Sequence, residues 1–203
     1  GLAGAPRAGS DVLLLNPAFS GPQLRDVLVR EQAAMVVYDQ EFQGVVDVAT
    51  EGLDVAEVVA WVDDAAALAG RTTVDTLVEQ HAGERPGRAS RRGSVILLTS
   101  DTTGTPKGAR RGADGGAAAL AAMFDRIPWR AEESVVVAAP MFHAWGFGQL
   151  AVAAATTCTV VTRRRFDPEA TLALVEEHAA TGLAVVPVML ERIIDLPEDV
   201  LER

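Results

Sequence analysis

This sequence is poor in cysteine, in lysine and in long apolar runs, and each shortage excludes a class of structure. Cys158 is the only cysteine among 203 residues, so an internal disulfide is excluded and a reducing, cytoplasmic setting is expected. It lies in the run TTCTVV, which ends in two valines, and this predicts a packed core side chain. No apolar stretch approaches the 18 residues of a membrane-spanning helix, and no segment is similar to a secretory signal peptide.

Positive charge is scarce as well. The chain carries 28 acidic and 18 basic side chains, which gives a net charge of −10. Because such a chain repels polyanions at long range, nucleic acid and anionic lipid are disfavoured as partners. With 49% hydrophobic and 23% charged residues, the composition is typical of a globular protein that is long enough to bury a core.

Short apolar runs alternate with helical patterns along the chain. This alternation is typical of an α/β fold with largely parallel sheets flanked by helices. The apolar runs predict strands at residues 12–15, 34–38, 45–50, 94–99, 135–139, 157–161 and 183–186. Helical periodicity predicts helices at residues 22–31, 55–68, 76–82, 117–126, 147–154, 167–180 and 187–194. The first strand, the first helix and the second strand together predict a β-α-β unit.

One stretch has the composition of a linker. Residues 81–93, HAGERPGRASRRG, are rich in glycine, arginine and proline, which predicts an exposed connection. It separates a first α/β part at 1–80 from a second at 94–203. Three consecutive arginines at 163–165 follow a predicted strand. We interpret them as a solvated strand end, with an anion site as the alternative.

The segment with the clearest chemistry is TSDTTGTPKG, residues 99–108. It follows a buried strand, and its hydroxyl side chains and backbone N–H groups would gather around one point beside Lys107, the only lysine. Hydroxyls, amides and a lysine are groups that bind the oxygens of a polyphosphate. The lysine does not directly follow a glycine as it does in the Walker A pattern, so a P-loop kinase or GTPase is disfavoured.

The same segment resembles the TSG[ST]TGxPKG signature of the adenylate-forming (AMP-binding) superfamily, which includes acyl-CoA synthetases, luciferases and peptide-synthetase adenylation domains. A second segment, AAPMFHAWGFGQL at 138–150, resembles the APLFHxxG segment of these enzymes. A third, at 163–197, is similar to a strand–helix–strand–helix of bacterial fatty-acid–CoA ligases. The three follow in the family's order, which implies part of the large N-terminal domain of an acyl-CoA synthetase.

The resemblance implies a reaction and a set of site residues. In the family, an acid and ATP form an acyl-adenylate, and CoA then takes the acyl group; Mg²⁺ assists. The ATP phosphates would be held by residues of the first segment: Thr99, Ser100, Thr102, Thr103, Gly104, Thr105 and Lys107. The acid pocket would include His143, Trp145 and Phe147, although a packed core role for His143 stays open. No residue is assigned as catalytic or as a metal ligand.

Two features limit what the resemblance implies. The later family motifs are absent, including the YGxTE-like and YxxGD-like motifs and the lid domain with its lysine. We therefore expect an incomplete piece of an acid–CoA ligase with weak or no activity. The alternative is a degenerate, non-catalytic nucleotide-binding α/β protein. The flanking segments favour a fatty acid as the substrate, an aryl acid stays open, and the oligomeric state is not predicted.

Asp101 stands where the signature has glycine. A carboxylate about 5 Å from one phosphate charge costs roughly 3 kcal/mol at an effective dielectric constant of about 20. We therefore expect Asp101→Gly to bind ATP about a hundredfold more tightly than the natural chain. Isothermal titration calorimetry of both proteins with ATP measures the difference, and equal affinities would remove the idea that Asp101 opposes the phosphates.

Overall fold

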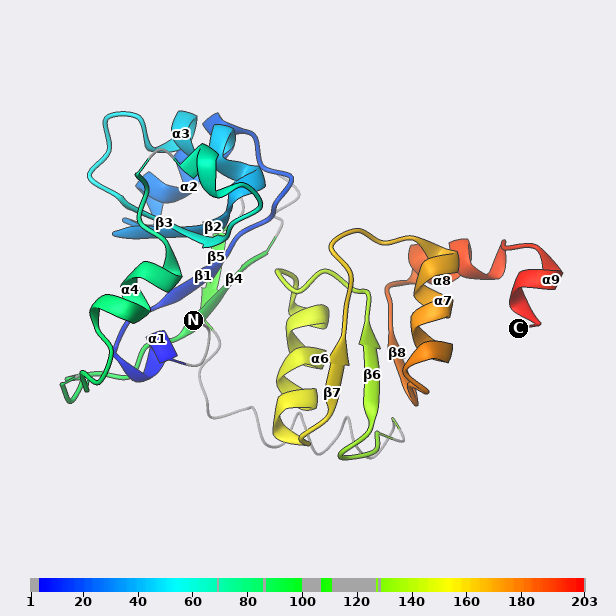
Figure 1. Cartoon of the computed structure of the whole chain (residues 1–203). Helices are drawn as coiled ribbons and strands as arrows, with labels where there is room; N and C mark the ends of the chain where they lie inside the picture. The colour runs from blue at the N-terminus through cyan, green and yellow to red at the C-terminus, as the bar shows by residue number, and fades with distance from the viewer. Residues whose placement is uncertain are drawn as a thin grey trace. The chain divides into compact units, whose positions relative to one another are not determined.

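The computed structural model describes residues 4–68, 70–85, 87–99, 107–110, 127 and 129–202. The chain divides into two units (Figure 1), and each is described by itself. One unit is Leu15–Arg88, and the other consists of Gly1–Leu14 together with Ala89–Arg203. Both combine parallel strands with helices, which confirms the predicted α/β class.

The unit Leu15–Arg88 is a two-stranded parallel sheet covered by helices. In chain order its elements are α2 (Gly21–Arg30), β2 (Met35–Asp39), η1 (Gln40–Phe42), α3 (Gln43–Thr50), β3 (Ala56–Trp61), η2 (Ala65–Leu68) and α4 (Val74–Gln80). Strands β2 and β3 pair in parallel, and helices α2 and α3 pack against each other. The helix α2 begins after Ser20, whose backbone N–H donates to Oε1 of Gln23 at 2.9 Å, as in a capping box.

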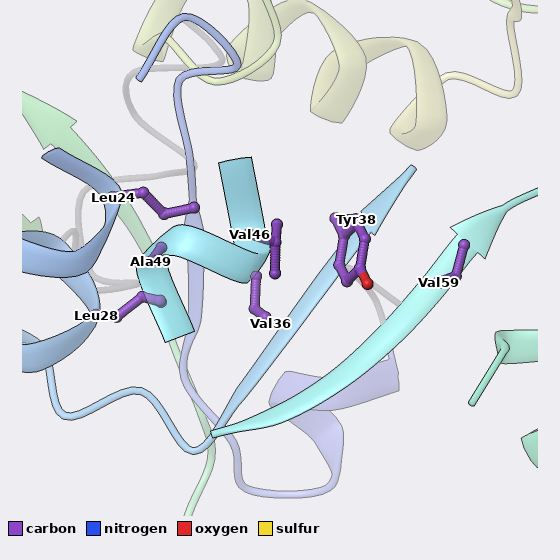
Figure 2. Close-up of a cluster of buried hydrophobic side chains, with 7 residues drawn as sticks. All are labelled: Leu24, Leu28, Val36, Tyr38, Val46, Ala49 and Val59. Atoms are coloured by element: carbon purple, nitrogen blue, oxygen red, sulfur yellow. The ribbon is translucent and has the colours of Figure 1, made fainter. Parts of the chain in front are cut away.

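The core of this unit follows from the alternation of side chains along β2. Val36 and Tyr38 are buried, whereas Met35 and Val37 are exposed, because successive strand residues point to opposite faces. Figure 2 shows the buried cluster, in which the two strands meet the helices α2 and α3. Its members are Leu24, Leu28, Val36, Tyr38, Val46, Ala49 and Val59.

Two predictions in this unit are wrong. Residues 45–50, predicted as a strand, form the helix α3, and residues 55–68, predicted as mostly helical, contain the strand β3. The valines of α3 favour a strand locally, but Val46, Ala49 and Thr50 fall on one helical face and are buried. Tertiary packing against α2 therefore outweighs local propensity.

A polar network connects the elements of the same unit. The Arg71 guanidinium lies 2.7 Å from Oδ1 of Asp47 on α3, contacts Glu57 on β3, and donates to the Tyr38 hydroxyl on β2 at 3.2 Å. Burial raises the pKa of Tyr38 above its usual value, while the Arg71 charge opposes that rise. The Thr50 hydroxyl lies 2.7 Å from Oε1 of Glu57. One cation thus ties a helix to both strands.

The second unit contains two three-stranded sheets. The first has the order β1 (Val12–Leu14), β4 (Val95–Thr99) and β5 (Lys107–Arg110), with β1 parallel and β5 antiparallel to β4. A short helix, α1 (Gly4–Arg7), precedes β1. The predicted β-α-β unit is therefore wrong, because β1 pairs with β4 and β2 pairs with β3.

Polar contacts fix the pairing of β1 with β4. Both oxygens of Asp11 accept from the Arg91 guanidinium, at 3.0 and 3.1 Å, and Oδ1 also accepts from the backbone N–H of Ser94 at 2.8 Å. A Cβ on Gly93 would lie 1.9 Å from the Ser10 carbonyl oxygen, so only glycine fits there. The described residues of the predicted linker are mostly exposed, but its end is held against the first strand. The unit boundary consequently differs from the predicted division at 80 and 94.

The last sheet is entirely parallel and has the order β7-β6-β8. Its strands are β6 (Ser134–Val137), β7 (Thr159–Val161) and β8 (Gly182–Ala184), and its helices are α6 (Ala144–Ala155), α7 (Pro168–Glu177), α8 (Pro187–Ile194) and α9 (Glu198–Leu201). Asp167 caps α7 as predicted, since its Oδ1 accepts from the N–H of Ala170 at 2.8 Å. The helix predicted at 117–126 lies outside the described residues.

Two further expectations concern single features. Cys158 is half-buried and its Sγ lies 3.2 Å from the carbonyl oxygen of Arg130, so the predicted core position is only partly correct. Within the described part of the chain, no helix has the length and apolar character needed to cross a membrane.

Replacing Arg71 by alanine should destabilise the unit Leu15–Arg88. The change leaves the half-buried Glu57 without its cation, and a hydrogen bond to a charged group contributes about 1.5–3 kcal/mol. Urea unfolding followed through Trp61, the tryptophan of this unit, measures the loss. The control is Arg30→Ala, which removes a pair between sequence neighbours and should cost less than about 0.5 kcal/mol. Equal losses in the two variants would contradict a central role for Arg71.

Candidate functional site

The predicted phosphate segment connects two paired strands. Thr99 ends β4 and Lys107 begins β5, and the two residues are partners in the antiparallel register. Their Cα atoms are therefore held about 5 Å apart. Lys107, expected in a loop, is thus the first residue of a strand. The other predicted phosphate ligands lie outside the described residues: Ser100, Thr102, Thr103, Gly104 and Thr105.

The predicted acid-binding residues belong to the sheet β7-β6-β8, where β6 is central. The chain leaves β6 for α6 and returns to β7 on one side, then crosses through α7 to β8 on the other. Right-handed crossovers in opposite directions put α6 and α7 on opposite faces of the sheet. The next helix, α8, packs against α7. The segments that follow β6 and β8 therefore leave toward opposite faces of the sheet. The edge where they part is a topological switch point, and ligands of open α/β sheets bind at such a point.

Hydrogen bonds hold the two diverging segments together at this edge. The backbone N–H groups of Ala138 and Ala139, which follow β6, both donate to the carbonyl oxygen of Ala184, at 3.0 and 2.9 Å. The Trp145 indole on α6 donates to the carbonyl oxygen of Val185 at 3.0 Å. Trp145 is thereby fixed at the switch point although its side chain is 44% exposed.

The first turn of α6 touches the segment that follows β6. A Cβ on Gly146 would lie 2.3 Å from the Pro140 carbonyl oxygen and 2.7 Å from that of Ala139. Glycine is required here because the opposing atoms belong to the backbone and cannot move aside. The close approach sets the position of His143, which precedes the helix as its N-cap residue, and of Trp145.

A cavity of about 220 Å³ opens beside Trp145. Helix α6 contacts β6 and β7. On that side of the sheet, the face of β8 is left for the cavity. Trp145 and Gln149 line it from α6, residues 182–184 line it from β8, and Trp129 closes it from the segment before β6. Two indoles, an apolar strand and an amide therefore surround one space.

Gln149 is the most deeply buried polar side chain of the cavity. It is 3% exposed, and it lines the cavity from α6. Its amide carries both hydrogen-bond donors and an acceptor.

The outer wall of the cavity is tied to the end of α6. The Trp129 indole donates to the Thr156 hydroxyl at 2.9 Å, and that hydroxyl donates to the carbonyl oxygen of Val152 at 2.8 Å. Arg130 also lines the cavity, but its side chain is mostly exposed and lies 3.7 Å from Glu133. The indole thus forms a fixed wall, and the guanidinium reaches toward solvent.

The structure separates the three predicted pocket residues. Trp145 lines the cavity, whereas His143 is exposed with its ring 4.3 Å from that of Phe142, so a packed core role for His143 is wrong. Phe147 is half-buried and is not among the lining residues. Sequence reasoning missed Gln149, although a signal existed: it is the polar residue four positions after Trp145, and residues four apart share a helical face.

Metal binding finds no support among the described residues. Within those ranges, no group of three or more histidine, cysteine, aspartate or glutamate side chains could hold a metal ion. The described residues therefore do not form a carboxylate cluster for Mg²⁺ by themselves.

Comparisons with known proteins agree with the sequence motifs. The AMP-binding enzyme family matches residues 1–202. The chain is 28% identical over 196 residues to an indoleacetate–CoA ligase of Aromatoleum aromaticum, covering 94% of this chain and 38% of that enzyme. It is 28% identical over 106 residues to a 2-succinylbenzoate–CoA ligase of Bacillus pumilus, covering 52% of this chain and 22% of the relative.

A solved structure shares the fold. ATP-bound MatB from Rhodopseudomonas palustris superposes with a TM-score of 0.69 at 25% identity, over 94% of this chain and 37% of that one. The chain therefore spans well under half the length of these relatives.

Substitution of Gly146 should disturb the switch point. Gly146→Ala places a methyl group against backbone oxygens and should destabilise the protein by about 1–3 kcal/mol. Gly148→Ala, on the same helix, is the control, because a Cβ there meets nothing within 4 Å. It should stabilise the helix by about 0.5–1 kcal/mol. Urea unfolding of the two variants measures both values, and a Gly146→Ala protein as stable as Gly148→Ala would contradict the close approach.

Proposed function

The chain belongs to the AMP-binding enzyme family, and on this premise we propose that it supplies the phosphate-binding and acid-binding parts of an AMP-forming acid–CoA ligase. The proposal rests most on one observation. Two family segments, 99–108 and 138–150, fall on two structural features suited to the two substrates. These features are a paired strand end and a cavity beside Trp145.

The phosphate part is proposed on Thr99, residues 100–106 and Lys107. The antiparallel register pairs Thr99 with Lys107, the two residues that flank residues 100–106. Lys107 supplies the positive charge that a polyphosphate requires. Because the chain carries a net charge of −10, this local cation is needed to offset the long-range repulsion of ATP.

The acid part is proposed in the cavity beside Trp145. An acid placed there with its carboxylate at the switch point has its apolar body against two indoles and the face of β8. Indole rings favour flat aromatic groups. The named acids of the two curated relatives, indoleacetate and 2-succinylbenzoate, both contain an aromatic ring. We therefore propose an aryl acid as the substrate, in place of the fatty acid that the flanking segments favoured.

The proposed reaction has two steps. A carboxylate oxygen attacks the α-phosphorus of ATP, the new P–O bond forms, and pyrophosphate leaves with the broken bond's electrons. The sulfur of CoA then attacks the acyl carbon, AMP leaves, and the thiol proton is released. In the first step the described residues contribute by binding and orienting: Lys107 toward the leaving phosphates and Trp145 toward the acid.

The first test is nucleotide binding by the chain itself. Lys107→Ala should weaken ATP binding roughly ten- to a hundredfold, because a hydrogen bond to a charged group contributes about 1.5–3 kcal/mol. The matched control is Arg192→Ala, which removes an exposed cation on α8 and should leave the affinity unchanged. Isothermal titration calorimetry with ATP measures both. Equal weakening by the two substitutions would show that only the net charge of the chain affects ATP binding. That outcome would contradict a phosphate site at Lys107.

ATP–pyrophosphate exchange separates the enzyme from the alternative. Exchange that depends on an added aryl acid supports adenylation chemistry in this chain. ATP binding without any acid-dependent exchange supports the degenerate, non-catalytic nucleotide-binding protein instead.

A further inference from the structure

We propose that Thr156 is a positioning residue, which holds the Trp129 indole as the end wall of the cavity, and that this wall limits the length of the acid. The inference rests on the proposed function, because it assumes that the cavity beside Trp145 holds the acid. Neither the family match nor the names of the relatives assign a role to Thr156 or Trp129.

The cavity extends from one edge of the sheet toward the other. Trp145 lies at the switch point, where its indole donates to the carbonyl oxygen of Val185, the residue after β8. Trp129 precedes β6 and Thr181 precedes β8, and both line the cavity. Because the strands are parallel, residues that precede them lie at the edge opposite the switch point. The four residues of β6 separate the two edges by about 13 Å. An acid with its carboxylate at the switch point therefore extends toward Trp129.

One hydroxyl fixes the indole at this far edge. Thr156 is the C-cap residue of α6, and its hydroxyl donates to the carbonyl oxygen of Val152 at 2.8 Å. The same oxygen accepts from the Trp129 indole N–H at 2.9 Å. That N–H is the only polar group of an indole, so the bond determines how the ring is oriented. The backbone N–H of Glu132 donates to the Thr156 carbonyl oxygen at 2.9 Å. Thr156 thus holds both a side chain and the backbone of the wall segment.

The backbone around Thr156 indicates that this corner has one fixed arrangement. Glu132 and Thr157 both have a left-handed backbone, with φ of 65° and 56°. This conformation is unusual for a β-branched residue such as threonine, and it persists only where the surrounding contacts hold it. The Thr157 hydroxyl also donates to the Thr156 carbonyl oxygen, at 2.7 Å.

A fixed end wall gives the length of the acid a measurable effect. An acid that is too long has to displace the indole, and inserting extra methylene groups into a packed space is unfavourable. Without a fixed wall the same methylene groups gain apolar contacts, and the longer acid binds more tightly. The direction of the length preference therefore reports whether the wall is held.

The probes are 3-phenylpropanoate and 7-phenylheptanoate, which have the same two ends and differ by four methylene groups. Isothermal titration calorimetry with the full chain measures both affinities. The natural chain should prefer the shorter acid by about tenfold or more. The readout is the ratio of two affinities in one protein, so a partial loss of folded protein lowers both and leaves the ratio unchanged.

Two substitutions remove the hydrogen bond from opposite sides. Thr156→Val keeps the shape of the side chain without its hydroxyl, and Trp129→Phe keeps an aromatic ring without its N–H. Each should abolish the preference or reverse it, and the double variant should add nothing further, since both remove one interaction. Thr156→Ser keeps the hydroxyl and should retain the preference.

The matched control is Thr171→Val on α7, the helix on the other face of the sheet. The Thr171 hydroxyl donates to the carbonyl oxygen of Asp167 at 2.6 Å, and the side chain is buried. Its loss should lower stability and leave the length preference unchanged. A loss of the preference in this control would show that the ratio follows stability, and it would overturn the positioning role of Thr156.

Each other outcome overturns a distinct claim. Tighter or equal binding of the longer acid by the natural chain would overturn the end wall while leaving the acid site intact. A preference that survives both Thr156→Val and Trp129→Phe would overturn the positioning role alone. Binding of neither acid would overturn the proposed acid site and this inference with it. Trp129→Phe and the natural chain decide the question even if Thr156→Val fails to fold.

Discussion

The central position of β6 between β7 and β8 is the constraint on which the candidate acid site depends. Because the chain adds β7 on one side and β8 on the other, the segments after β6 and β8 leave toward opposite faces. The divergence creates the switch point where Trp145 is hydrogen-bonded to Val185. It also leaves the face of β8 beside α6 free to form the cavity. Gly146 allows α6 to lie close to the segment that follows β6. Both the hydrogen bond of Trp145 and the cavity depend on this close approach.

The two parts of the proposed site meet opposite physical demands. Phosphates need many donors and a cation, and the proposed cation, Lys107, is paired with Thr99 in the strand register. An acid with an aromatic body needs a space from which water is excluded, and such a space requires a helix, a sheet face and a separate wall. Gln149 brings a buried amide to the side of the cavity that also carries Trp145.

Single polar residues fix the pairings elsewhere in the chain. Arg71 joins α3 to both strands of the unit Leu15–Arg88, and Asp11 joins the first strand to the segment before β4. Each links residues that are distant in the sequence. Such contacts select one strand partner among several apolar candidates, since an alternative pairing would leave a half-buried charge without its partner.

The sequence alone determined the α/β class, the family and most element positions, and it predicts the phosphate segment. These follow from local signals: apolar alternation, the cap at Asp167, and a motif whose residues are adjacent in the chain. It did not determine that 45–50 is a helix, that 56–61 is a strand, or that the first two strands join different sheets, because these depend on partners distant in sequence. Only the tertiary structure placed Gln149 beside the cavity. A polar residue in an apolar helix is ordinary until the fold leaves an empty space beside it, and that space exists because α6 covers β6 and β7 but leaves part of β8 uncovered.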